Sequence, residues 1–124
     1  MENKFLFVGE KRSALARKMG VTWKDGRLSA KHLMTAIDHA NLDINNCDFK
    51  NVFREILDYN VINKTAVREI KKFNGIVVAM GRKVEKVLIE NNIDHKFVYH
   101  PATRGEYRNI NKYCNHFKEH INEE

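Results

Sequence analysis

The sequence contains one proline, two cysteines and six scattered glycines among its 124 residues. It has no proline- or glycine-rich linker that would divide the chain, so we expect a single domain over residues 1–124. The cysteines, Cys47 and Cys114, lie far apart and lack the spacing of a metal site or a disulfide framework. No apolar run approaches the roughly 18 residues of a membrane-spanning helix, and the first residues lack a signal-like pattern. We therefore expect a cytoplasmic monomer with free thiols and no membrane association.

Positive charge, in contrast, is abundant. The 22 Lys and Arg residues outnumber the 16 Asp and Glu residues, which gives a net charge of +6 and a calculated isoelectric point of 9.4. Such an excess is typical of small proteins that bind nucleic acid, although many basic domains do not. The sequence contains neither a P-loop nor a G-x-G-x-x-G motif, so we do not expect an enzyme of nucleoside triphosphates or dinucleotides.

Short apolar runs predict four β-strands, over residues 5–8, 51–53, 76–80 and 96–99. Their continuous apolarity is typical of strands that are covered on both faces. Apolar residues at helical spacing predict helices over 11–19, 28–41, 63–73, 82–92 and 104–122. The alternation of strands and helices predicts an α/β layered domain with a mostly parallel sheet. Ligands of such sheets bind at the carboxyl ends of the strands, which makes the residues there candidates for function.

Each predicted strand is followed or overlapped by residues with binding chemistry. A glycine turn and a helix start, which favours an anion, follow the first strand. The Asn51 amide offers both a donor and an acceptor to a polar ring, and the His100 imidazole can donate to a developing oxyanion. Each also has a structural reading, as a turn residue or a buried histidine. The candidates at the first, third and fourth strand ends are Gly9, Glu10, Lys11, Arg12 and Ser13, then Arg82, and then His100.

Four segments resemble the motifs of the uracil-DNA glycosylase superfamily in order and spacing. They are Val8-Gly9-Glu10, Lys50-Asn51-Val52-Phe53, Val78-Ala79-Met80-Gly81-Arg82 and His100-Pro101-Ala102. The resemblance covers nearly the whole chain. It implies a three-layer α/β/α sandwich with a central four-stranded parallel sheet. It also implies a DNA-repair hydrolase that flips a uracil out of DNA and cleaves its N-glycosidic bond without a cofactor.

The resemblance assigns roles to individual residues. His100 corresponds to the histidine that stabilises negative charge on the departing base, and Asn51 to the asparagine that hydrogen-bonds the uracil edge. Glu10 falls in the family's first motif, with Gly9 beside it. In the family, this motif binds the flipped nucleotide and often positions the attacking water. Trp23, Phe53 or Tyr99 can stack on the base, or belong to the core.

Phosphate contacts are expected from two groups of side chains. Lys11, Arg12, Ser13 and Arg82 lie at the strand ends. Arg104, Arg108 and Lys112 recur every four residues and share one face of the last predicted helix, which suits either a DNA backbone or solvent.

Two functions stay open. The family's first motif continues into Pro-Gly or Pro-Tyr, where this chain has Lys11-Arg12-Ser13. The protein is either a glycosylase acting on uracil or a modified base in DNA, single-stranded or with the base flipped out, or a catalytically silent relative that binds nucleic acid or a free nucleotide. The two differ at Glu10, because only an enzyme needs a positioned water. An H-x-x-E-H pattern over 116–120 matches a zinc-protease motif, but we expect no metal and no cofactor.

Overall fold

A computed structural model describes residues 3–55, 59–103 and 105–122. The strands are β1 (Phe5–Gly9), β2 (Cys47–Asn51), β3 (Ile76–Met80) and β4 (Lys96–Val98). The helices are α1 (Ala14–Met19), α2 (Ser29–His39), α3 (Lys64–Lys72), α4 (Arg82–Glu90) and α5 (Ile110–Ile121). Short 3-10 turns cover Trp23–Asp25, Ile44–Asn46 and Gly105–Arg108. In the described part of the chain, no helix has the length and apolarity needed to span a membrane.

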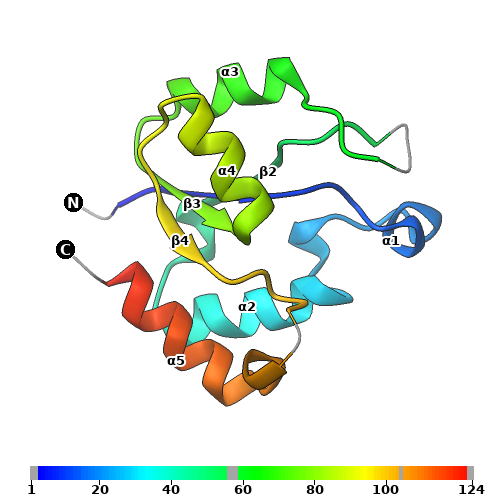
Figure 1. Cartoon of the computed structure of the whole chain (residues 1–124). Coiled ribbons are helices and arrows are strands. Elements are labelled where there is room, and N and C mark those ends of the chain that lie inside the picture. Colours follow the sequence, from blue (N-terminus) through cyan, green and yellow to red (C-terminus); the bar gives the residue numbers. More distant parts are fainter. Residues whose placement is uncertain (1–2, 56–58, 104, 123–124) are drawn as a thin grey trace.

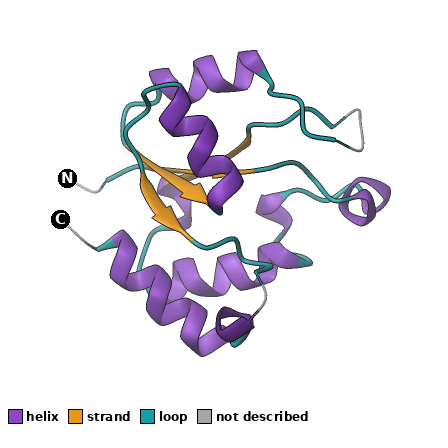
Figure 2. Cartoon of the chain, viewed as in Figure 1, coloured by secondary structure: helices purple, strands orange, loops and turns teal. Residues whose placement is uncertain are grey.

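The four strands form one parallel sheet in the order β2-β1-β3-β4. Helices α3 and α4 cover one face, and α2 and α5 cover the other, which gives an α/β sandwich (Figures 1 and 2). The predicted fold class is therefore confirmed. The sheet order places β1 and β3 in the centre, so their carboxyl ends lie side by side at one edge of the domain.

Alternate residues of the central strands enter two separate cores. Phe5 and Phe7 of β1 pack with α2 and α5, while Leu6 and Val8 pack with α3 and α4. All four side chains are buried. This arrangement explains why β1 and β3 have continuous apolar sequences, because both faces of a strand alternate in period two and both are covered here.

The second predicted strand is wrong by several residues, since β2 ends at Asn51 rather than beginning there. β2 is an edge strand with only Cys47 fully buried, so its sequence is too polar to read as a buried strand. The apolar pair Val52 and Phe53 lies just beyond the ladder and packs in the core with α3 and α4. The shift matters for the site, because Asn51 now pairs with Gly9 at the carboxyl ends of both strands.

The last predicted helix is also wrong at its start. Asn109 caps α5 by accepting from the backbone N–H groups of Asn111 and Lys112, so the helix begins at Ile110. Arg108 belongs to the preceding 3-10 turn, and Arg104 lies outside the described residues. Arg108 and Lys112 therefore do not share one face of α5, as the predicted basic face requires. The other four predicted helices are confirmed, with ends that differ by up to three residues.

Candidate functional site

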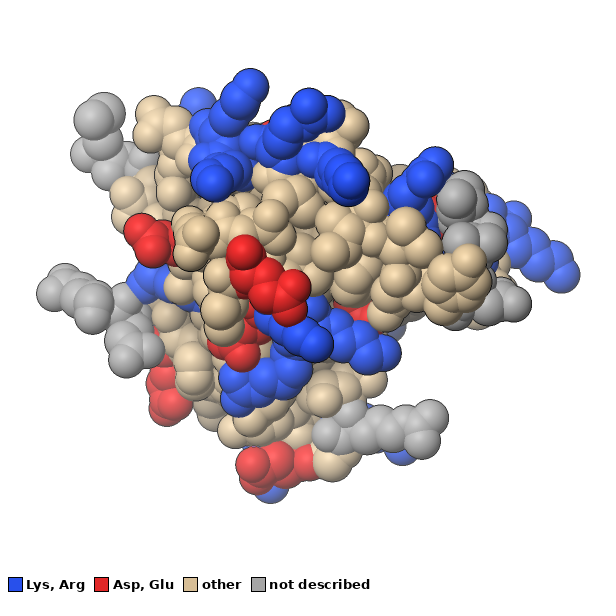
Figure 3. Space-filling view, turned by 45° about the horizontal axis from the view of Figure 1, so that its top comes forward, with Lys and Arg blue, Asp and Glu red and all other residues tan. Residues whose placement is uncertain are grey.

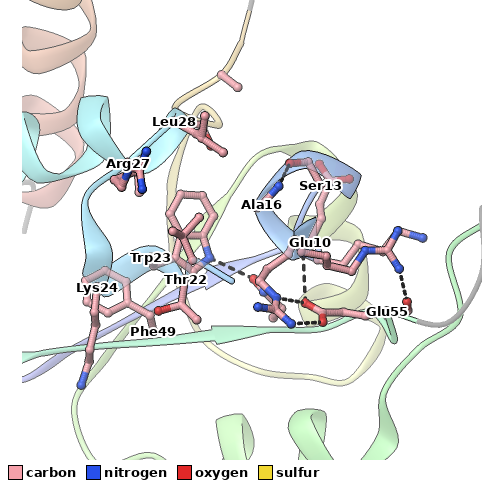
Figure 4. Close-up of a pocket in the computed structure, with 18 of the residues that line it drawn as sticks. Glu10, Ser13, Ala16, Thr22, Trp23, Lys24, Arg27, Leu28, Phe49 and Glu55 are labelled. Carbon is pink, nitrogen blue, oxygen red and sulfur yellow. Dashed lines mark hydrogen bonds and ion pairs between the residues drawn. The ribbon is translucent and has the colours of Figure 1, made fainter. Parts of the chain in front are cut away.

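A cavity of about 790 Å³ opens at the carboxyl edge of the sheet, beside β1 and β2. This volume lies in the range of small-molecule sites. Five of the predicted residues at the strand ends, Glu10, Lys11, Arg12, Ser13 and His100, line it together with Asn51 and Trp23. In Figure 4, Trp23 lies on the same side as Leu28 and Phe49, and Glu10, Ser13 and Ala16 lie toward the other side. Residues distant in sequence thus meet around one cavity.

The Asn51 amide is held in a defined orientation. The indole Nε1 of Trp23 donates a hydrogen bond to Asn51 Oδ1 at 3.0 Å (Figure 4). An indole N–H can only donate, so the oxygen of the amide must face Trp23. The Nδ2 group of Asn51, which has no partner among the described residues, then remains as a donor for a ligand, and the second lone pair of Oδ1 remains as an acceptor.

Gly9 makes room for this pair. A Cβ atom at Gly9 would lie 2.8 Å from Asn51 Oδ1 and 2.8 Å from Trp23 Cζ2. Neither approach is found for real Cβ atoms, so any side chain at this position would displace the amide or the indole. Gly9 does not line the cavity, but the close packing of Asn51 and Trp23 requires it.

His100 presents a neutral imidazole. Its Nδ1 accepts a hydrogen bond from the backbone N–H of Ala102 at 3.0 Å, which is possible only when Nδ1 carries no proton. The neutral ring therefore carries its proton on Nε2, as a donor. Burial lowers the pKa of His100, and the negative charge of Glu10 opposes this shift only in part. Trp23 packs beside the imidazole, with ring centroids 5.9 Å apart.

Glu10 follows β1 directly and brings a carboxylate to the same cavity. Its side chain is 29% exposed, and Lys83 Nζ lies 4.0 Å from its Oε1. The backbone of Glu10 is fixed, because its carbonyl accepts from the N–H of Phe53. The carboxylate is thus placed near His100 but is neither enclosed nor tightly paired, and it can accept a proton or a hydrogen bond from a bound water.

The expected phosphate contacts of the β1–α1 turn are occupied within the protein. Arg12 forms a two-pronged ion pair with Glu55, with both N–O distances at 2.8 Å. The hydrogen bond from Arg12 lowers the pKa of the Glu55 carboxyl. Ser13 caps α1 by accepting from Ala16, and Lys11 Nζ donates to the Tyr59 carbonyl. These side chains shape the cavity wall and are not aimed at a ligand phosphate.

Three further predicted residues lie away from the cavity. Phe53 is 7% exposed and packs in the core with α3 and α4, so it cannot stack on a ligand there. Arg82 pairs with Glu85 at 2.9 Å and stacks over Phe97. Lys112 is exposed on α5. The sequence placed Arg82 correctly at a strand end, but its own helix and the neighbouring strand supply its partners.

The residue before His100 is held by two buried side chains of α5. The N–H of Tyr99 donates to His116 Nε2 at 2.9 Å, and Tyr113 donates its hydroxyl to the Tyr99 carbonyl at 2.7 Å. β4 is an edge strand, so α5 satisfies polar groups that no further strand can pair. Burial lowers the pKa of His116 to about 4. The H-x-x-E-H pattern therefore has a structural use, and no cluster of metal-ligating side chains occurs in the described part of the chain.

Most of the visible excess of positive charge lies elsewhere. Lys and Arg side chains gather over the upper part of Figure 3, on the side of α3. The basic residues of α3 are Lys64, Arg68, Lys71 and Lys72, and all four are exposed. The cavity itself is lined by both signs of charge, since Lys24, Arg27 and Arg17 share its wall with the carboxylates of Glu10 and Glu55. Arg17 also donates to the Glu55 carbonyl.

Phe49 and Leu28 also line the cavity, although neither was predicted from the sequence. Phe49 lines the cavity two residues before Asn51, on the same face of β2, and a strand placed over 47–51 would have revealed it. Leu28 is 40% exposed at the start of α2, with a φ of +58° that is unusual for leucine. No sequence pattern indicates that conformation.

The chain matches no known protein-family model, and a search of curated proteins finds no match.

Proposed function

We propose that this protein binds a nucleobase of the uracil type in the cavity at the carboxyl edge of its sheet. The observation that carries the proposal is the Trp23–Asn51 hydrogen bond beside a neutral His100. Together they offer two N–H donors and one acceptor lone pair to a planar ring, with the aromatic rings of Trp23 and Phe49 in the same wall. Uracil has two carbonyl oxygens and an N–H between them, which match this set.

Cytosine matches the set poorly. It replaces one carbonyl by an amino group and the ring N–H by an acceptor, so a complementary amide would have to turn over. A reversed Asn51 would place its NH₂ group against the Trp23 N–H, leaving two donors facing each other. The fixed amide thus supports a preference for uracil over cytosine.

Hydrolysis of the N-glycosidic bond is the activity that the site supports, as the resemblance to uracil-DNA glycosylases implies. When this bond breaks, its electron pair leaves with the base and positive charge develops on the sugar. The donors of His100 and Asn51 are available for the developing negative charge on the base oxygens. Glu10 is available to take a proton from a water whose oxygen forms the new bond to the sugar carbon.

A catalytically silent nucleotide-binding protein is the alternative, and the β1–α1 turn favours it. Arg12 and Ser13, which replace the proline-containing part of the family motif, are engaged with Glu55 and Ala16. This turn therefore stabilises the fold and does not position a water. Glu10 would have to direct the attacking water without help from Arg12 or Ser13, and a silent protein needs no such water.

The test is incubation with single-stranded DNA containing one uracil, followed by alkali and measurement of strand scission. We expect scission to fall by about 100-fold in His100→Ala, the range for loss of an oxyanion donor, while the exposed-histidine control His39→Ala keeps full activity. Glu10→Gln should lose scission but retain DNA binding, with Glu90→Gln as its control. Binding without scission in the unmodified protein would favour the silent alternative. Failure to bind deoxyuridine by calorimetry at millimolar concentration would refute the proposal.

DNA as the carrier of the base is tested separately by gel retardation. If the protein binds DNA through its Lys and Arg side chains, retardation of single-stranded DNA should weaken steeply between about 50 and 200 mM salt. Absence of retardation at low salt, with deoxyuridine still bound, would restrict the ligand to a free nucleoside or nucleotide.

A further inference from the structure

A second cavity, of about 560 Å³, adjoins the first. The two share Leu28, Ser29 and Ala102 in their walls. The second is bounded by the start of α2 on one side and by the segment after His100 on the other. Thr103, which lies in its wall, donates its backbone N–H to the His100 carbonyl at 2.9 Å. The wall of the second cavity is therefore hydrogen-bonded directly to His100.

The chemistry of this cavity is that of an anion site. Arg108 lines it, and none of the eight described lining residues is acidic. Ser29 and Thr103 bring hydroxyl groups to the same wall. A guanidinium presents several donors in a planar fork that matches the oxygens of a phosphate.

His32 adds an observation that the fold alone does not explain. Its Nδ1 atom is buried, and it has no hydrogen-bond partner among the described residues. An unpaired buried nitrogen costs free energy, and such groups in native structures are usually satisfied by a ligand or water. His32 lines the second cavity, so a turn of its ring would bring a ring N–H to an acceptor bound there.

We propose that the second cavity binds the phosphate of a nucleotide whose base occupies the first cavity, with Arg108, His32 and Ser29 as its contacts. This inference rests on the proposed function for the choice of ligand. It makes a nucleotide or a nucleotide unit of DNA the preferred ligand over a free base or nucleoside. It also gives Arg108 a role that does not depend on a basic helical face.

Calorimetric titration of the whole protein with deoxyuridine, its 5′-monophosphate and its 3′-monophosphate tests this. We expect one of the monophosphates to bind about tenfold or more tightly than deoxyuridine, as expected for charge-assisted hydrogen bonds. Arg108→Gln should remove that difference and leave the deoxyuridine affinity unchanged. His32→Phe should reduce the difference. The matched control Lys112→Gln removes a nearby exposed cation and should behave as the unmodified protein.

Inorganic phosphate provides a probe that does not depend on the base. In an NMR titration we expect it to shift the amide signals of Ser29 and Thr103, and Arg108→Gln should abolish these shifts. Equal affinities for deoxyuridine and both monophosphates would overturn the phosphate proposal and leave base binding intact. Phosphate shifts without any binding of deoxyuridine would instead refute the proposed function and leave an anion site. A monophosphate preference that survives Arg108→Gln would place the phosphate elsewhere and overturn this assignment.

Discussion

Replacing Trp23 by phenylalanine removes the N–H that fixes the Asn51 amide and keeps an aromatic ring at the position. In the native protein, reversing the amide exchanges a 3.0 Å hydrogen bond for two donors that face each other. An unsatisfied buried donor costs about 1–3 kcal/mol. That cost corresponds to about a 5- to 150-fold preference for the ligand that uses the fixed orientation.

In Trp23→Phe the two amide orientations become close in energy, so the preference for deoxyuridine over deoxycytidine should fall by a factor in this range. Calorimetric titration of both nucleosides against both proteins measures the ratio directly. Phe49→Leu is the matched control, because it alters aromatic surface in the same cavity without touching the amide. It should weaken both nucleosides alike and keep their ratio.

Equal weakening of both nucleosides by Trp23→Phe, with an unchanged ratio, would contradict this role of the Trp23 N–H. Trp23 would then act by stacking alone, and the orientation of Asn51 would be set by something else.

Three more outcomes follow from the structure. Gly9→Ala places a Cβ atom 2.8 Å from Asn51 Oδ1, so nucleoside binding in calorimetry should fall at least tenfold, which corresponds to about 1.4 kcal/mol. Unchanged binding would contradict the need for glycine at this position. Tyr113→Phe leaves the Tyr99 carbonyl without its 2.7 Å partner and should lower the free energy of unfolding in urea by about 1–2 kcal/mol. Deoxyuridine binding should also weaken, because Tyr99 directly precedes His100. Unchanged stability would contradict this role of the Tyr113 hydroxyl. Burial lowers the pKa of His116 from 6.5 to about 4, so the unfolded chain binds this proton more tightly, and the stability that depends on neutral His116 is complete above about pH 6.5 and is lost as the pH falls toward 4. Urea unfolding at pH 7 and pH 5 should therefore show a loss of stability that His116→Gln reduces. Equal pH dependence in both proteins would contradict this role of His116.

The central strands and the covering helices were predictable because each has a strong local signal. β1 and β3 are continuous apolar runs between polar segments, and α2, α3 and α4 carry apolar residues at helical spacing. β2 was misplaced because an edge strand needs little apolar sequence. The start of α5 was misplaced because the cap at Asn109 is a single-residue signal inside a long periodic pattern.

The site was predictable only as a set of residues. A parallel sheet brings the carboxyl ends of its strands to one edge, so the sequence could bring Glu10 and His100 together once the strands were assigned. Asn51 was expected at the start of its strand and lies at the same edge because β2 ends there. The sequence could not say which polar groups remain available there. Three features depend on how segments far apart in the chain pack together. They are the pairing of Arg12 with Glu55, the hydrogen bonds of Tyr99 to His116 and Tyr113, and the unpaired Nδ1 of His32.

The sequence by itself determined the layered fold, because hydrophobic periodicity is a local property of the chain. The tertiary structure alone decided the chemistry at the carboxyl edge of the sheet. Hydrogen bonds and close approaches, such as Trp23 to Asn51 across Gly9, form between side chains that only folding brings within 3 Å of each other, and those contacts determine which donors a ligand meets.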